Sequence, residues 1–315
     1  MEGLYFNSTS QNQSYNYSYS ICNYQSYINI TVTDYSYNFT SSYYDYSEFE
    51  EYCKKLFIVY VVTCIIIAIG LPLILVAIYA LYSMVRSDHV APIYLINLLI
   101  TDLLQLCFMI VEVAQPEDWK ISEIFFYFYL VVLVASVNFM VCISLERYLV
   151  IAHPLWYHFG RTIKSSVVVC VLVWVISLVF VVLFYFVDYL VAIIMFVILQ
   201  LLPFPPLIFS LVGTLKALSA TISVPSDQKR RIVGILVLVL LIYTLLFLPN
   251  IIFYLEDLKE KYDENLDILS FIFVKFSPLA DSVLYVFMRK GFIDKLLASV
   301  CCCRMDSNDI SRSSV

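Results

Sequence analysis

Charged residues are scarce in this sequence. Of its 315 residues, 14% are charged and 6 are glycine, whereas 62% are hydrophobic. A soluble globular domain carries about 25% charged residues, so the composition excludes that class and predicts an integral membrane protein. The scarcity of glycine and the abundance of Val, Ile, Leu and Phe favour helical spans over the short alternating strands of a barrel. The sequence also lacks the basic patch that a nucleic-acid partner would need.

Lysine and arginine are absent from residues 1–52, which are rich in Tyr, Ser, Asn and acidic side chains. Such a segment buries too little apolar surface to offset its ordering entropy, so residues 1–55 are predicted to form a disordered extracellular tail. No signal-peptide pattern precedes it, and the first membrane helix is expected to direct insertion. Five Asn-x-Ser/Thr sequons predict glycosylation, at Asn7, Asn12, Asn16, Asn29 and Asn38.

Tyrosines alternate with carboxylates between Tyr43 and Tyr52. Two interpretations stay open. The stretch is either a sulfated segment that attracts a basic ligand or a solvated tail that binds none.

Seven apolar segments are long enough to cross a membrane as helices. The fourth and fifth form one run that is too long for a single helix, and the chain is expected to turn at Asp188. Pro203, Pro205 and Pro206 are expected to kink the fifth helix. The sequence therefore predicts an all-α membrane protein, a seven-transmembrane helix bundle in residues 56–288. The predicted spans are 56–82, 90–114, 121–151, 166–187, 189–215, 232–255 and 266–288.

Most of the 19 Lys and Arg lie in predicted cytoplasmic segments if the N-terminus is outside. This orientation, which the sequons also require, indicates a multi-pass protein of the plasma membrane and its lipid bilayer. In the segment 289–315, a short amphipathic cytoplasmic helix is predicted from Met288 to Leu297. The cysteines after it, Cys301, Cys302 and Cys303, are candidates for palmitoylation. The last residues, Ser313-Ser314-Val315, form a short motif that a PDZ-domain protein could bind.

An adjacent acid and base, Glu146 and Arg147, close the third span. Charges in this position are costly unless they lie at the cytoplasmic interface and are paired or used. The pair is either a switch that faces the cytosol or a pair of ordinary interfacial charges.

The seven spans and the Glu146-Arg147-Tyr148 triplet resemble the rhodopsin-like (class A) G-protein-coupled receptors. The resemblance covers about residues 56–303. Its opening, Gly70-Leu71-Pro72, is most similar to the branch that holds purinergic, hydroxycarboxylic-acid, proton-sensing and protease-activated receptors. The further markers follow in order: Asn97, Asp102, His153-Pro154-Leu155, Trp174, Pro203, Phe247-Leu248-Pro249 and Asp281-Ser282-Val283-Leu284-Tyr285.

The resemblance implies a cell-surface receptor that couples an extracellular ligand to a heterotrimeric G protein. Arg147 would meet the C-terminal helix of the G-protein α subunit, Leu155 would fill a pocket on it, and Tyr285 would support Arg147. Pro249 would let the inner end of the sixth helix move outward. The implied coupling residues are Glu146, Arg147, Tyr148, Leu155, Pro249, Asp281 and Tyr285.

The same resemblance implies a sodium ion, as an allosteric modulator, held by Asp102, Ser136, Ser277 and Asp281. Carboxylates in the middle of a membrane need a cation or a proton. A protonated Asp102–Asp281 pair without metal therefore stays open as the alternative, and no other cofactor is expected.

Lys275 is the one basic residue deep within a predicted span. Three interpretations stay open: an ion pair with Glu112, contact with an anionic or peptide ligand terminus, or the attachment of retinal as in opsins. Phe125 occupies the usual opsin counter-ion position. The ligand is unknown, but the acidic external segments favour a basic peptide or amine. The implied ligand pocket contains Glu112, Phe126, Tyr129, Leu133, Phe247, Tyr254, Phe271 and Lys275.

The chain departs from the family at its extracellular disulfide, because Ser122 occupies the position of the usual cysteine in the third helix. Cys22 and Cys53 remain as an extracellular pair. Altered switch positions, such as Leu211 and Ser282, leave a non-signalling pseudo-receptor or scaffold as one alternative. A membrane transporter is another, although no internal repeat is evident. The sequence contains no phosphate loop, zinc-ligand spacing or nucleophile–base set, so an enzyme is not expected.

Overall fold

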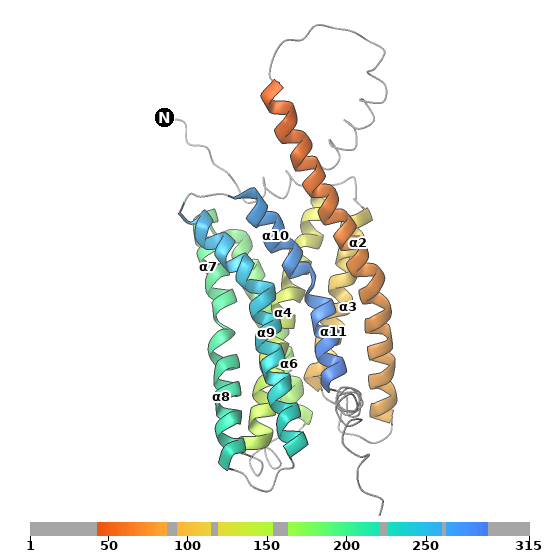
Figure 1. Ribbon diagram of the computed structural model, residues 1–315, viewed down its shortest axis with the longest axis vertical. Helices are drawn as coiled ribbons and strands as arrows, with labels where there is room; N and C mark the ends of the chain where they lie inside the picture. Colours follow the sequence, from red (N-terminus) through yellow and green to blue (C-terminus); the bar gives the residue numbers. More distant parts are fainter. Residues whose placement is uncertain are drawn as a thin grey trace, which may run out of the picture.

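The computed structural model of the protein describes residues 43–86, 93–114, 119–153, 163–220, 226–259 and 263–288. Within these ranges the chain is helical and contains no strand (Figure 1). The helices are α2 (Tyr43–Arg86), α3 (Ile93–Ala114), α4 (Trp119–Ala152), α6 (Ile163–Phe186), α7 (Tyr189–Leu201), α8 (Phe204–Ala220), α9 (Ser226–Asp257), α10 (Glu264–Lys275) and α11 (Ser277–Met288).

Seven helical segments are long and apolar enough to cross a membrane. The predicted seven-helix bundle is therefore confirmed. α7 with α8 forms one span, and α10 with α11 forms another. The turn expected at Asp188 is also present, because α6 ends at Phe186 and α7 begins at Tyr189.

Two of the spans are interrupted by proline. The fifth span breaks at Leu202 and Pro203, between α7 and α8, as the prolines there predict. The seventh span breaks at Phe276, between α10 and α11. Pro278 explains this second break, because its ring has no N–H and would clash with the carbonyl of Val274 in a continuous helix.

α2 is longer than the sequence predicts. It begins at Tyr43, whereas the sequence predicts that the first span begins at residue 56. Once a membrane span has nucleated a helix, each further turn costs little, and the helix can continue outward. An ion pair of 3.1 Å between Lys55 Nζ and Glu51 Oε1, one turn apart, supports this outer part. In Figure 1 the outer end of α2 extends past the other helices.

α4 lies at the centre of the bundle, where it packs against α3, α6, α8 and α9. Its inward side chains, among them Phe139 and Met140, are fully buried in the largest apolar cluster. The outer faces carry exposed aliphatic side chains, as Val168 and Val171 of α6 illustrate. Polar side chains such as Asp102 and Ser136 are buried instead. This arrangement suits a bundle surrounded by lipid.

Several predictions fall outside the described residues and stay predictions. They are the sequons at Asn7, Asn12, Asn16, Asn29 and Asn38, the cysteine Cys22, Leu155, the amphipathic helix beyond Met288, the cysteines Cys301, Cys302 and Cys303, and the C-terminal Ser313-Ser314-Val315 motif.

Candidate functional site

The outer part of the bundle holds a buried ion pair between α10 and α3. Lys275 Nζ lies 2.6 Å from both carboxylate oxygens of Glu112 and 3.2 Å from Thr63 Oγ1 of α2. The ring of Phe271 lies 4.5 Å from the same nitrogen. Lys275 is 1% exposed, whereas the side chain of Glu112 is 43% exposed. The ion pair expected from the sequence is therefore present, and Thr63 is an additional partner that the sequence did not reveal.

Two carboxylates lie in the middle of the bundle, where Asp102 and Asp281 are both fully buried and close enough to interact. Ser136 Oγ donates to Asp281 Oδ2 at 3.1 Å. Among the described residues, no well-aligned hydrogen bond reaches the Asp102 oxygens, Asp281 Oδ1 or Ser277 Oγ, although Asp102 and Ser277 both lie close to Asp281. Buried, unpartnered oxygens are the ligands that a small hard cation prefers, so the residues present fit a sodium ion.

Gln105 is a member of this buried cluster that the sequence analysis missed. It follows Asp102 by three residues on α3 and therefore lies on the same helix face. Its amide is fully buried without a hydrogen-bond partner in the described part of the chain. A glutamine within an apolar run was the available signal.

The inner end of α4 carries the Glu146-Arg147-Tyr148 triplet. Glu146 is buried and Arg147 is half-buried. Arg147 Nε has no hydrogen-bond partner among the described residues. Tyr285 of α11 is buried in the largest apolar cluster, and Pro249 lies inside α9.

The predicted ligand-pocket residues are distributed over several side-chain clusters of the bundle. Leu133 and Phe247 line a cavity of about 30 Å³ that also contains Gln200. Phe126 packs in a separate apolar cluster with Leu130 and Val181. The remaining aromatic residues lie in three other places. Phe271 lies beside Lys275, and Tyr254 lies beside Phe196 at the outer end of α9. Tyr129 lies between the apolar clusters around α4 and α3.

A chain of hydrogen bonds crosses three helices in the outer half of the bundle, and the sequence analysis did not anticipate it. Gln200 of α7 donates to Asn250 of α9, and Asn250 Nδ2 donates to Ser270 Oγ of α10 at 3.3 Å. Tyr243 of α9 donates to the backbone carbonyl of Gln200. Asn250 directly follows Pro249, so these contacts join α7, α9 and α10 next to the proline of α9.

Two family markers meet in the inner half. Trp174 Nε1 of α6 donates to Asn97 Oδ1 of α3 at 3.2 Å, and Asn97 Nδ2 lies 3.3 Å from Cys170 Sγ. These positions are far apart in the sequence, and their contact connects α3 to α6.

The cysteines divide into one bonded and several free side chains. Cys53, in the outer part of α2, is disulfide-bonded. The other described cysteines, Cys64, Cys107, Cys142 and Cys170, are free. The partner of Cys53 therefore lies outside the described residues, and its pairing with Cys22 stays a prediction.

Comparison with known proteins shows a similarity over part of the chain. Residues 73–190 match the model of the 7 transmembrane receptor (rhodopsin family). This part of the chain is similar to that family. It is similar to mouse G-protein coupled receptor 68, with 34% identity over 124 residues that make up 36% of this chain and 33% of that one.

Further relatives confirm the predicted branch of the family. A human purinoceptor is 34% identical over 119 residues, which cover 35% of this chain and 36% of that receptor. Rat 2-oxoglutarate receptor 1 is 36% identical over 129 residues, which cover 38% of this chain and 37% of that receptor. The matched part thus covers about a third of each relative's length. All three are named as receptors and not as enzymes, in agreement with the sequence.

Proposed function

We propose that this member of the rhodopsin family is a cell-surface receptor that couples an extracellular ligand to a heterotrimeric G protein. The observation that carries the proposal is Arg147 at the inner end of α4. Its half-buried guanidinium has a nitrogen, Nε, without a hydrogen-bond partner among the described residues. A buried charged donor left unpaired is costly, which supports a role for Arg147 in meeting a partner that arrives from the cytosol.

The proposed orientation places the N-terminus outside at the plasma membrane. The bonded state of Cys53 supports it, because disulfides persist in oxidising compartments and are rare in the cytosol. The excess of basic residues in the segments assigned to the cytosol points the same way. An epitope tag at the N-terminus should therefore be stained on unpermeabilised cells.

The proposed activating motion centres on α9. Pro249 removes a backbone hydrogen bond inside this helix and supplies a flexible point. The neighbouring Asn250 holds α9 to α7 and α10 through Gln200 and Ser270. Ligand binding that loosens these contacts would let the inner end of α9 move away from α4 and free the surface around Arg147.

The proposed ligand is a basic peptide or amine. The carboxylate of Glu112 is part-exposed beside Lys275 and could accept a second cation. The outer ends of α9 and α10 add Glu256, Asp257, Asp263 and Asp267. Acidic groups of this density attract cationic ligands over a distance of about 10 Å at physiological salt.

The central carboxylates are proposed to hold sodium as a modulator. Asp102, Ser136, Ser277 and Asp281 supply the oxygen ligands. A bound sodium ion would neutralise one of the two acids, a proton on the other would balance the second charge, and the filled site would favour the resting arrangement of α3, α4 and α11. Palmitoylation at the C-terminal cysteines and a PDZ partner remain further proposals for the cytoplasmic tail.

The test compares the unmodified chain with Arg147→Ala at matched surface level, and measures activation of each G-protein subtype with and without a library of basic peptides. Activation that Arg147→Ala abolishes is the expected result. Lys164→Ala is the matched control, because Lys164 is an exposed base at the same end of the bundle, in the first turn of α6. Equal activation by Arg147→Ala would contradict the proposal, and no activation at all would favour a pseudo-receptor or a transporter.

A further inference from the structure

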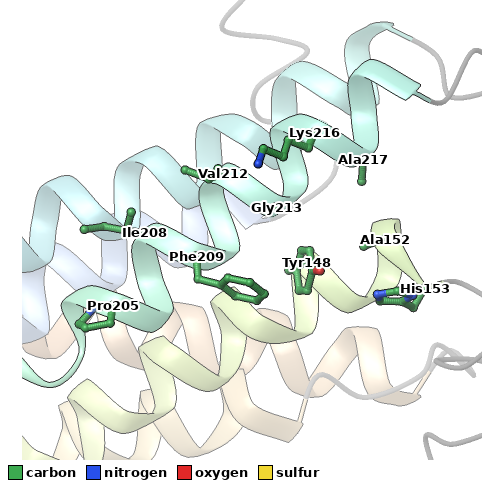
Figure 2. Close-up of a pocket in the computed structure, with 10 residues that line it drawn as sticks. All are labelled: Tyr148, Ala152, His153, Pro205, Ile208, Phe209, Val212, Gly213, Lys216 and Ala217. Atoms are coloured by element: carbon green, nitrogen blue, oxygen red, sulfur yellow. The ribbon is translucent and has the colours of Figure 1, made fainter.

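A groove runs along the inner half of the bundle between α4 and α8. Its volume is about 620 Å³, which is within the range of ligand sites. Figure 2 shows the two sides of its wall, with Tyr148 of α4 and the following His153 on one side and Phe209, Gly213 and Lys216 of α8 on the other. The exposure of Ile208 and Phe209 indicates that the groove opens on the outer, lipid-facing side of the bundle.

Gly213, which has no side chain, shapes the floor of this groove. A Cβ atom at Gly213 would lie 2.5 Å from Cε2 of Tyr148, so glycine allows α8 to approach the tyrosine ring closely. The same ring packs edge-to-face with Phe209, with 5.1 Å between ring centroids. The floor is therefore aromatic and fixed by close packing.

The length of the groove corresponds to one leaflet of the bilayer. Along α8 it extends from Pro205 to Ala217, which is about 18 Å of helix. Half of the hydrocarbon core of a bilayer is about 15 Å thick. A single extended acyl chain would therefore fill the groove from the headgroup region to about the membrane midplane.

Basic side chains mark the inner end of the groove. Lys216 is exposed in the penultimate turn of α8, and His153 is exposed directly after the end of α4. The described residues that line the groove include no aspartate or glutamate, and most of the others are apolar. The flexible side chain of an exposed lysine near a helix end can reach the interface, where its ammonium would attract an anionic headgroup.

We propose that this groove binds one anionic phospholipid of the inner leaflet, with an acyl chain along α8 and the headgroup on Lys216. The assignment to the inner leaflet rests on the orientation in the proposed function. The bound lipid would contact Tyr148, which follows Arg147 in the chain, and would therefore act next to the surface proposed for the G protein.

The test uses the full chain in bilayer discs that contain phosphatidylserine and phosphatidylcholine. The lipids that remain bound after transfer to detergent are counted by native mass spectrometry. We expect Lys216→Gln to reduce the preference for phosphatidylserine by about fivefold, the usual effect of one lysine at an anionic surface. We expect Val212→Trp to reduce retention of both lipids, because the indole would occupy the groove.

Two matched variants control for general effects. Lys164→Gln removes another exposed base at the inner end of the bundle, and Ile198→Trp adds an indole to an exposed position of the same span outside the groove. Both should leave lipid retention unchanged. Folding of each variant is checked by its melting temperature.

Three results would overturn the proposal. An equal loss of the preference for phosphatidylserine in Lys216→Gln and Lys164→Gln would mean that the basic residues attract anionic lipid without forming a defined site. Retention of phosphatidylserine that does not depend on Lys216 would indicate that the groove does not select an anionic headgroup. Retention unaffected by Val212→Trp would place the lipid elsewhere. Because lipids occupy both leaflets of a disc, the lipid test does not depend on the orientation of the chain. The N-terminal tag tests the orientation separately.

Discussion

Two buried clusters of charge in this bundle are arranged in opposite ways. In the outer cluster, the ammonium of Lys275 meets a carboxylate, a hydroxyl and an aromatic ring. In the central cluster, Asp102 and Asp281 have like charge, and one serine hydroxyl is the hydrogen-bond donor to them in the described part of the chain. The charge of Lys275 is balanced within the outer cluster, whereas the charges of the central cluster need a proton or a cation. The difference separates a structural contact from a site that responds to its surroundings.

The largest effect is expected for Glu112→Ala. The substitution leaves the buried Lys275 with Thr63 as its one remaining hydrogen-bond acceptor among its described contacts. Breaking a buried ion pair from one side costs about 3–5 kcal/mol. The free energy of unfolding in mixed micelles measures this cost, and a loss under about 1 kcal/mol would show that the outer cluster is not a structural contact.

A smaller effect is expected for Lys275→Met. Glu112 is part-exposed and can be solvated once the lysine is gone, so the cost should be about 1–2 kcal/mol. Combined with Glu112→Ala, Lys275→Met should recover most of the stability that Glu112→Ala loses, because no unpaired charge remains. A double-mutant cycle on the same unfolding measurement gives the coupling energy, and simple additivity of the two losses would argue against a direct pair.

Sodium should stabilise the central cluster. At a sodium concentration ten times the dissociation constant, linkage adds about 1.4 kcal/mol to the free energy of unfolding. Asp102→Asn should remove this dependence, measured in sodium chloride against choline chloride at equal ionic strength. Ser177→Ala should keep it, because Ser177 is equally buried but donates to a backbone carbonyl of its own helix. An unmodified protein that does not respond to sodium would support the protonated pair instead.

The sequence was sufficient to predict the spans, one of the two helix breaks and the outer ion pair. The seven spans follow from length and hydropathy alone, and the break at Pro203 follows from proline chemistry. The break at Phe276 was missed although Pro278 carried the same signal. The Glu112–Lys275 pair could be expected because a buried ammonium requires a counter-charge and the resemblance brings the two helices together.

Contacts that depend on helix rotation could not be predicted. Thr63 lies on a third helix, and nothing in the sequence fixes which side of that helix faces Lys275. The same reason applies to Gln200 and Asn250, whose polarity within apolar runs indicated burial but not a mutual contact. The groove between α4 and α8 depends on a glycine and a tyrosine more than sixty positions apart, whose proximity appears only after packing.

The smallest effect is expected for Glu51→Ala, which removes an ion pair of the same two residue types from the exposed outer part of α2. The side chain of Glu51 is 68% exposed, and an exposed pair one turn apart on a helix contributes about 0.3–0.5 kcal/mol. The unfolding measurement used for Glu112→Ala should therefore barely change. Both Glu51→Ala and Glu112→Ala remove the glutamate partner of a lysine. The ratio of their losses in the free energy of unfolding therefore isolates the contribution of burial. Similar costs would mean that burial of Lys275 adds nothing, and the contrast between the outer and central clusters would then rest on the carboxylates alone.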